Sequence, residues 1–210
     1  MGLNRRKGFS LTEIVIVVGI ISLMSSLVLA RIPALRTQTR VSASAANMKR
    51  VILDARRRST SIIEFKAGSN VFPSYGAFVE LANPGRITIF ADCKLDDNGD
   101  GTISNQDYFF YNQASVNCPA PNSNGFVENI FLEQGITIKA IRTFSSNPMS
   151  GAPQTKGSVE YLRPEPSIWI SYGNSGTLLG LGGLAIDIAD VTNTYKKTIV
   201  IWITGNIEIL

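Results

Sequence analysis

The stretch that decides the fold starts with Phe9-Ser-Leu-Thr-Glu13 and continues as Ile14-Val-Ile-Val-Val-Gly-Ile-Ile-Ser-Leu-Met-Ser-Ser-Leu-Val-Leu-Ala30. A helix needs about 20 apolar residues to cross the hydrocarbon layer of a membrane, and residues 9–32 reach that length if Glu13 is tolerated. Arg5, Arg6 and Lys7 precede the run, and such a basic cluster stays cytoplasmic. Composition therefore predicts a single-span anchor, with everything after Ala30 outside.

A cleaved secretory signal peptide is the competing interpretation of the same residues. Such a peptide has a basic start, a shorter apolar core and a small-residue cleavage site, which Ser25, Ser26 and Ala30 could supply. Glu13 argues against it, because a carboxylate in lipid costs free energy and serves no purpose in a discarded peptide. An ionisable residue at membrane depth predicts a function and a partner.

The run Gly8-Phe9-Ser10-Leu11-Thr12-Glu13 with its apolar helix resembles the type IV prepilin family, which includes the pseudopilins of type II secretion. The resemblance implies that a prepilin peptidase cuts between Gly8 and Phe9 and methylates the new amine of Phe9. It also implies that Glu13 pairs with the N-terminal amine of a neighbouring subunit. Two opposite charges in an apolar helix bundle are costly apart and tolerable together, which supports that pairing.

A second helical segment follows the apolar run. Pro33 is expected to kink or interrupt the helix. The apolar positions then recur at steps of three and four, which predicts a helix lying on a folded domain. These positions are Val41, Ala45, Met48, Ile52 and Ala55. The triplet Arg56-Arg57-Arg58 suits a solvated helix end, where positive charge complements the helix dipole.

After Ser59 the sequence changes to short β-rich runs separated by Gly, Pro, Asn and Ser. The predicted strands are Ala77–Leu81, Arg86–Ala91, Tyr108–Tyr111, Ile136–Phe144, Ser158–Leu162, Ser167–Ser171, Leu184–Ile188 and Thr198–Ile203. A closing hairpin is expected where Thr204-Gly205-Asn206 leads into Ile207–Leu210. Residues 117–125 and 145–156 are expected to be loops by composition.

The predicted fold class is α+β: a long N-terminal helix, membrane-embedded in its first half, packed on a mostly antiparallel β-sheet domain. The predicted boundaries are a cleaved leader at 1–8, an assembly helix at 9–32, its amphipathic second half at 33–60 and a globular domain at 61–210. Three segments are more loosely similar to the minor pseudopilin and FimT-like group: Tyr75–Glu80, Ile87–Gly101 and Tyr195–Ile207.

Composition limits the chemistry. The chain has no histidine, which excludes Ser-His-Asp and Cys-His catalysis, and it has no Walker loop or nucleophile elbow. We therefore expect no enzyme. The net charge of +4 falls to +1 without Arg5, Arg6 and Lys7, so the basic pI of the precursor says little about nucleic acid.

Two further features concern the exported part. Cys93 and Cys118 are an even pair that could form a disulfide in an oxidising compartment, and two buried reduced thiols are the alternative. The acidic loop 96–107 resembles the calcium loops of EF-hands and dockerins, which predicts a structural Ca²⁺ site. Its expected ligands are Asp96, Asn98, Asp100, the carbonyl of Thr102, Ser104 and Asp107. An ion-free Asp/Gly turn is the alternative.

Three functions were weighed against these residues. A structural subunit of a type IV pilus or pilus-like secretion filament, a minor pilin or pseudopilin, agrees with the N-terminus. Its partners would be other subunits, the prepilin peptidase and, before assembly, the inner membrane. A DNA-binding competence pilin is the alternative, suggested by Lys196, Lys197 and the arginine triplet, although the near-neutral processed charge disfavours it. An anchored enzyme has no supporting motif.

Overall fold

The computed structural model describes residues 10–61, 63–64, 72–92, 124–162, 168–172 and 182–210. Helix α1 (Leu11–Thr60) comes first, and all the strands follow it. The chain divides into two compact units at Thr39/Arg40, so that α1 contributes its first part to one unit and its second part to the other. The predicted α+β class is confirmed.

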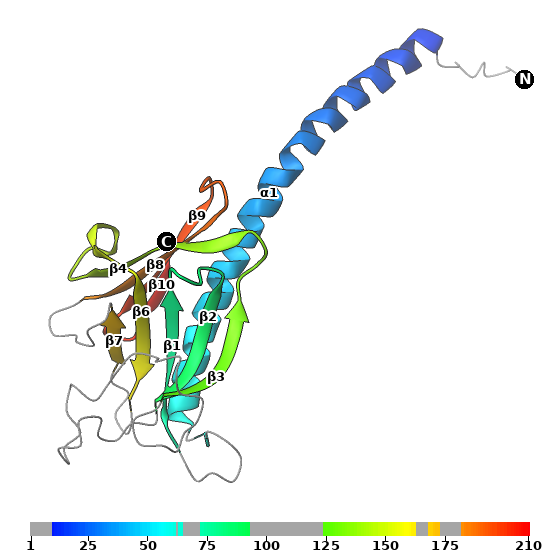
Figure 1. Ribbon diagram of the computed structural model, residues 1–210. Helices are drawn as coiled ribbons and strands as arrows, with labels where there is room; N and C mark the ends of the chain where they lie inside the picture. Colours follow the sequence, from blue (N-terminus) through cyan, green and yellow to red (C-terminus); the bar gives the residue numbers. More distant parts are fainter. Residues whose placement is uncertain (1–9, 62, 65–71, 93–123, 163–167, 173–181) are drawn as a thin grey trace, which may run out of the picture. The chain divides into compact units, whose positions relative to one another are not determined.

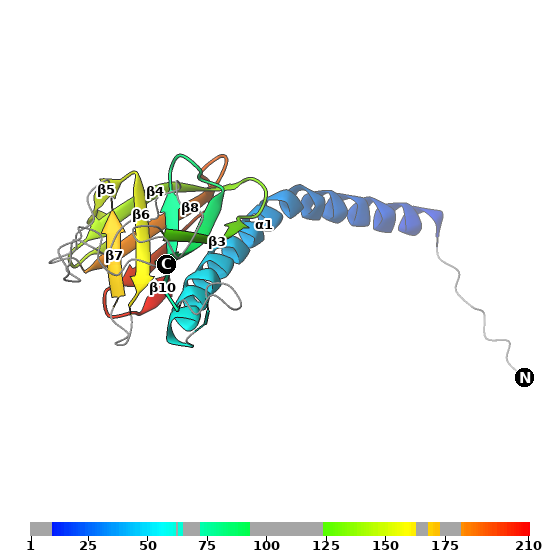
Figure 2. The same cartoon turned by 60° about the horizontal axis from the view of Figure 1, so that its bottom comes forward.

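Within the described residues, ten strands form two antiparallel sheets of five strands each. The first sheet has the order β3-β2-β1-β6-β7, which Figures 1 and 2 show from two directions. Its strands are β1 (Ser74–Glu80), β2 (Arg86–Asp92), β3 (Asn124–Phe131), β6 (Lys156–Tyr161) and β7 (Ile168–Tyr172). The second sheet has the order β10-β9-β8-β4-β5. Its strands are β4 (Ile136–Phe144), β5 (Ala152–Gln154), β8 (Gly183–Asp190), β9 (Lys196–Trp202) and β10 (Ile207–Ile209).

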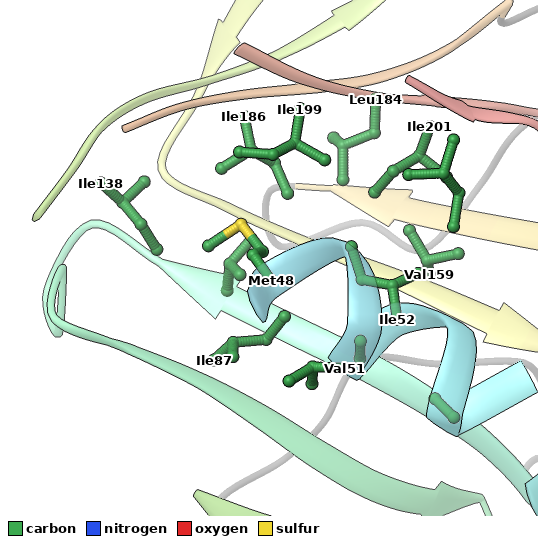
Figure 3. Packing of buried hydrophobic residues seen from close by; sticks show 14 of the residues in the cluster. Met48, Val51, Ile52, Ile87, Ile138, Val159, Leu184, Ile186, Ile199 and Ile201 are labelled. Carbon is green, nitrogen blue, oxygen red and sulfur yellow. The ribbon is translucent and has the colours of Figure 1, made fainter. Parts of the chain in front are cut away.

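One hydrophobic core joins the second part of α1 to both sheets. The five predicted apolar positions of this helix segment, from Val41 to Ala55, are each at most 1% exposed. Figure 3 shows Met48 and Ile52 within a cluster of side chains from both sheets, including Ile87, Val159 and Ile199. The predicted amphipathic stripe is therefore confirmed as the face that this segment buries.

Seven of the eight predicted strands are confirmed, and the eighth, Tyr108–Tyr111, lies outside the described residues. Strands β3 and β5 are new: β5 lies within residues 145–156, which were predicted to be a loop, and β3 had no predicted strand and overlaps the predicted loop 117–125 only at its first two residues. Pro33 lies inside α1, so of the two predicted outcomes, a kink or an interruption, the interruption is wrong and the kink stays a prediction. A proline removes one backbone donor and crowds the preceding turn, yet the helix continues, and the Thr37 hydroxyl donates to the Pro33 carbonyl at 3.1 Å.

The expected hairpin at residues 204–206 is confirmed. The amide of Trp202 donates to the carbonyl of Asn206 at 2.9 Å, and the amide of Gly205 donates to the carbonyl of Trp202 at 2.8 Å. Gly205 has φ = 90°, a left-handed conformation that glycine adopts without steric cost. β10 then pairs with β9 through Ile207 and Ile201, so β9 has neighbours on both sides, as its apolar sequence predicted.

Candidate functional site

The first part of α1 is an apolar rod without a buried face. No described residue from 10 to 39 is buried. Its large apolar side chains are between 49% and 80% exposed, except for Ile32, which is half-buried. The exposed ones are Leu11, Ile14, Val15, Ile16, Val17, Val18, Ile20, Ile21, Leu23, Met24, Leu27, Val28, Leu29 and Leu35. A helix that is apolar all round requires a non-aqueous environment, either lipid or other helices. By length and composition, α1 is the one helix of the described residues that could cross a membrane.

Ser10 caps this rod. Its side-chain oxygen accepts a hydrogen bond from the backbone amide of Glu13 at 3.3 Å, and its carbonyl accepts from the amides of Glu13 and Ile14 at 3.1 and 3.3 Å. Glu13 therefore lies in the first turn, where the helix dipole favours a carboxylate. This cap was not predicted, although Ser10-Leu-Thr-Glu13 has the spacing of a capping box.

The Glu13 carboxylate has no hydrogen bond or ion pair within the part of the chain that the structure describes. The backbone cap uses the Glu13 amide and leaves the side chain available. A carboxylate in an apolar environment is stable only with a partner, so that partner must come from outside the described residues. The predicted processing site, Gly8 and Phe9, also lies outside them.

Small residues interrupt the apolar surface of the rod. Gly19 has no atom within 4 Å of the position that a Cβ would occupy, so its surface is open to close approach. The hydroxyls of Ser22 and Ser26 donate to the carbonyls of Val18 and Leu23, both at 2.8 Å. Because these hydroxyls are satisfied within the helix, they add little polar cost in a membrane, and small residues let helices pack closely.

Asp187 is the centre of the strongest ionic cluster in the folded domain. Its side chain is 2% exposed. It accepts hydrogen bonds from both terminal nitrogens of Arg142, one of them at 2.7 Å, and from the Thr198 hydroxyl at 2.7 Å. Lys196 Nζ lies 2.6 Å from Asp187 Oδ2. Burial raises the pKa of Asp187, but the hydrogen bonds from Arg142, Lys196 and Thr198 outweigh it and hold the pKa below its usual value.

The arginine triplet is partly solvated, with the Arg57 side chain 73% exposed, and two of its members also form ion pairs. Arg57 and Arg58 both donate to the carboxylate of Asp54 at 2.8 Å. Arg58 also lies 3.5 Å from Glu128 of β3, because the end of α1 runs beside that strand, and its side chain is 26% exposed. For Asp54, burial raises the pKa, and the two arginines overcome this and lower it.

These contacts weaken the DNA-binding alternative. Lys196, half of the predicted lysine pair, is engaged in an ion pair with Asp187, which it shares with Arg142. The groove beside α1 and β3, with a volume of about 590 Å³, mixes cations with carboxylates. It is lined by Asn47, Arg50, Val51, Leu53, Asp54, Arg57, Arg58, Ile89, Glu128 and Ile130. A phosphate backbone prefers a track of unpaired positive charge, which this groove does not offer.

The predicted metal loop and cysteines cannot be placed. Asp96, Asn98, Asp100, Thr102, Ser104 and Asp107 lie outside the described residues, and so do Cys93 and Cys118. Among the described residues, no group of three or more histidine, cysteine, aspartate or glutamate side chains could hold a metal ion. Calcium and the disulfide therefore stay predictions from sequence.

Comparison with known proteins identifies the N-terminal segment. Residues 3–29 match the family model described as the prokaryotic N-terminal methylation motif. This motif is the hallmark of type IV prepilins and pseudopilins, so the resemblance predicted from Gly8 to Glu13 is confirmed. No curated protein and no solved structure matches the chain.

The motif and the apolar rod point to the same class of protein. The motif at residues 3–29 supports a type IV pilin-like substrate of a prepilin peptidase, and the apolar N-terminal helix fits a single-pass membrane anchor. The family is structural and not enzymatic.

Proposed function

We propose that this chain is a filament subunit, a minor pilin or pseudopilin that is stored in the inner membrane and then assembled. The observation that carries the proposal is the rod itself, in which no described apolar side chain from Leu11 to Leu35 is buried and all but Ile32 are exposed. The second part of the same helix is buried in the domain core. The domain therefore has its own core, and the rod is available for lipid or for other subunits.

Assembly exchanges one apolar environment for another. In the membrane, the rod is surrounded by lipid; in a filament, it is surrounded by the rods of neighbouring subunits. Lipid tails and apolar side chains are similarly hydrophobic. The selectivity of the rod for other rods over lipid therefore comes from close packing at small residues such as Gly19 and Ser22 and from the polar group of Glu13.

Glu13 would set the register between subunits. Cleavage after Gly8 creates a positively charged amine on Phe9, four residues before Glu13 in the sequence. Within the described residues Glu13 has no partner, and the amine of a neighbour would supply one. Each charge would be costly alone in the apolar bundle, and the pair is tolerated because the two charges compensate each other.

Processing is tested by expressing the chain with and without a prepilin peptidase and measuring its mass. We expect the peptidase to remove residues 1–8 and to add a methyl group to Phe9. An unchanged mass with Met1 still at the terminus would refute the proposal. A Gly8→Ala variant is a control that should block cleavage and leave membrane insertion intact.

Assembly is tested separately, with Glu13→Gln as the variant. We expect incorporation into filaments to fall at least about tenfold, since a lost buried charge pair is worth a few kcal/mol, while cleavage continues. Glu208→Gln is the matched control, because Glu208 is exposed in β10 and bonds only locally to Asn206 among the described contacts. Equal incorporation of Glu13→Gln and wild-type chains would exclude the register role.

We also propose, from sequence, that the loop 96–107 binds Ca²⁺ as a structural ion. Binding to the folded state alone would raise the melting temperature by mass action. The test compares Ca²⁺, Mg²⁺ and a chelator on the wild-type chain and on Asp96→Asn/Asp100→Asn. An upward shift with Ca²⁺ that the double variant loses supports the ion, and identical melting in all three conditions supports an ion-free turn.

A further inference from the structure

Two arginines stand at the end of the apolar rod. Arg31 follows Ala30 directly, Arg36 comes five residues later, and both side chains are exposed. The sequence has no aspartate or glutamate between Glu13 and Asp54, so neither arginine has a carboxylate at the three- or four-residue spacing that pairs charges on a helix. Neither forms an ion pair with a described residue.

Helix geometry places both arginines near the lipid phosphates. A hydrocarbon layer of about 30 Å accommodates about 20 helical residues at a rise of about 1.5 Å each. If the layer begins at Ile14, it ends close to Pro33. Arg31 then lies roughly 3 Å inside that boundary and Arg36 roughly 4–5 Å beyond it, in a headgroup layer about 5–8 Å thick. The long aliphatic stem of Arg31 lets its guanidinium reach the same layer.

The chemistry of the two side chains selects the ligand. A guanidinium presents a planar fork of N–H donors that matches two oxygens of a phosphate. Arg31 and Arg36 are separated by about 140° around the helix, so they would contact two different lipid molecules. We propose that Arg31 and Arg36 bind the phosphates of acidic phospholipids in the leaflet at the C-terminal end of the rod, and so fix the depth of the helix before assembly.

The location of these charges supports a specific role. This inference rests on the proposed function, in which residues after Ala30 lie outside the cytoplasm. The positive-inside rule predicts few arginines within 15–20 residues of a membrane span on that side. Arg31 and Arg36 oppose this bias, and binding to anionic headgroups offsets the cost of placing them there.

The experiment measures lipid selectivity around the reconstituted full chain. Wild-type and Arg31→Gln/Arg36→Gln chains are placed in vesicles with spin-labelled phosphatidylglycerol or phosphatidylcholine, and the immobilised fraction of each label gives a relative association constant. We expect a preference for phosphatidylglycerol that falls by up to about fivefold for each arginine removed and weakens in high salt. The leader contributes equally to both chains, so their difference reports the two arginines.

Lys49→Gln/Arg50→Gln is the matched control, because it removes the same number of charges more than three helical turns further along the chain. We expect it to keep the wild-type preference, and Arg31→Lys/Arg36→Lys to keep most of it. Equal losses in the two glutamine variants, or no loss in either, would overturn the proposal. Filament incorporation that is lost while lipid preference is unchanged would also overturn it, and would assign the arginines to a carboxylate of a neighbouring subunit.

The outcome is independent of the processing test. Lipid selectivity is measured on the uncleaved chain, so a chain that the peptidase leaves intact refutes the filament role without changing the lipid result. A chain that is cleaved and assembled but shows no lipid preference refutes the lipid contact and leaves the filament role standing.

Discussion

The two parts of α1 have the same backbone conformation and opposite surroundings. In the first part, apolar residues occupy every side of the helix, and none of those described is buried. In the second part, apolar residues form one stripe, and that stripe is buried against both sheets. Helix formation therefore does not depend on whether the apolar side chains are buried within the chain or exposed. The distribution of those side chains around the axis decides whether a segment folds onto its own chain or needs an outside partner.

Charged groups follow the same division. Asp187 in the domain is surrounded by Arg142, Lys196 and Thr198. In the rod, by contrast, Glu13 has no side-chain partner among the described residues. A buried charge whose partners belong to the same domain is accommodated within the fold. A charge in an apolar environment that has no such partner needs one from another molecule.

The largest expected effect comes from truncating one isoleucine to alanine in each part of α1. Ile52 is fully buried and Ile20 is 52% exposed. Ile52→Ala should lower the free energy of unfolding of the domain by about 3 kcal/mol, through lost burial and a cavity, whereas Ile20→Ala should change it by less than about 0.5 kcal/mol. Urea unfolding of the full chain in mild detergent, followed by tryptophan fluorescence, measures both. Similar losses in the two variants would abolish the distinction between the two parts.

An arginine pair gives the next largest effect. Arg142 is 15% exposed and shares Asp187 with Lys196 and Thr198. Arg142→Met should cost about 2 kcal/mol of domain stability, because the carboxylate keeps two of its partners. Arg31→Met, the matched change in the rod, should leave the same unfolding curve in place. A destabilised Arg31→Met chain would mean that the rod contributes to domain stability.

A serine pair sharpens the comparison at a smaller scale. The buried Ser59 hydroxyl accepts from the Tyr75 amide at 2.8 Å and donates to the Tyr161 carbonyl at 2.5 Å, which ties the end of α1 to the first sheet. Ser59→Ala should cost about 1–2 kcal/mol by leaving buried backbone groups unpaired. Ser22→Ala removes a bond within the rod's own turn and should not move the domain's denaturation midpoint. Equal midpoints for all three chains would contradict the assignment.

The smallest expected effect is on how strongly acid lowers the stability of the folded domain. The pKa of Asp187 is below its unfolded value of 3.8, since the hydrogen bonds to its charged form outweigh burial. Its contribution to stability is thus complete above about pH 4 and is lost as the pH falls through the folded-state pKa. Asp187→Asn should flatten the acid limb of a stability profile between pH 6 and pH 2. An acid limb that is as steep in Asp187→Asn as in wild type would be the contrary result.

The elements whose residue types recur at a regular spacing were predictable from the sequence. The stripe from Val41 to Ala55 is correct at every position, and β4 has the predicted bounds, Ile136–Phe144. In the helix segment, apolar residues recur every three to four positions, and β4 is rich in β-branched residues. The tertiary contacts of both elements agree with these local patterns.

The two missed strands lack such a pattern for physical reasons. β3 pairs with β2 through a register shift between Ile89 and Phe90, and this bulge breaks the alternation that marks a strand. β5 has three residues, one of them Pro153, and lies at the edge of its sheet, where a missing amide is tolerated. Neither feature can be found without knowing the pairing.

The functional residues at the start of the rod were predictable from the sequence, whereas the ionic cluster in the folded domain was not. Gly8, Phe9 and Glu13 follow a motif of fixed spacing, so residue order identifies them. The Asp187 cluster depends on strand register, which brings together residues 45 positions apart. One signal was present, because an acid within the apolar run Leu184–Ile188 had to find a partner.

The shared core of the domain also has a consequence in time. Met48 and Ile52 pack with Ile199 and Ile201, which are made roughly 150 residues later. At synthesis rates of about 5–20 residues per second, the apolar stripe is made roughly 8–30 s before its last partners. The rod is therefore synthesised before the domain can close, and any factor that shields the stripe has to act during that interval.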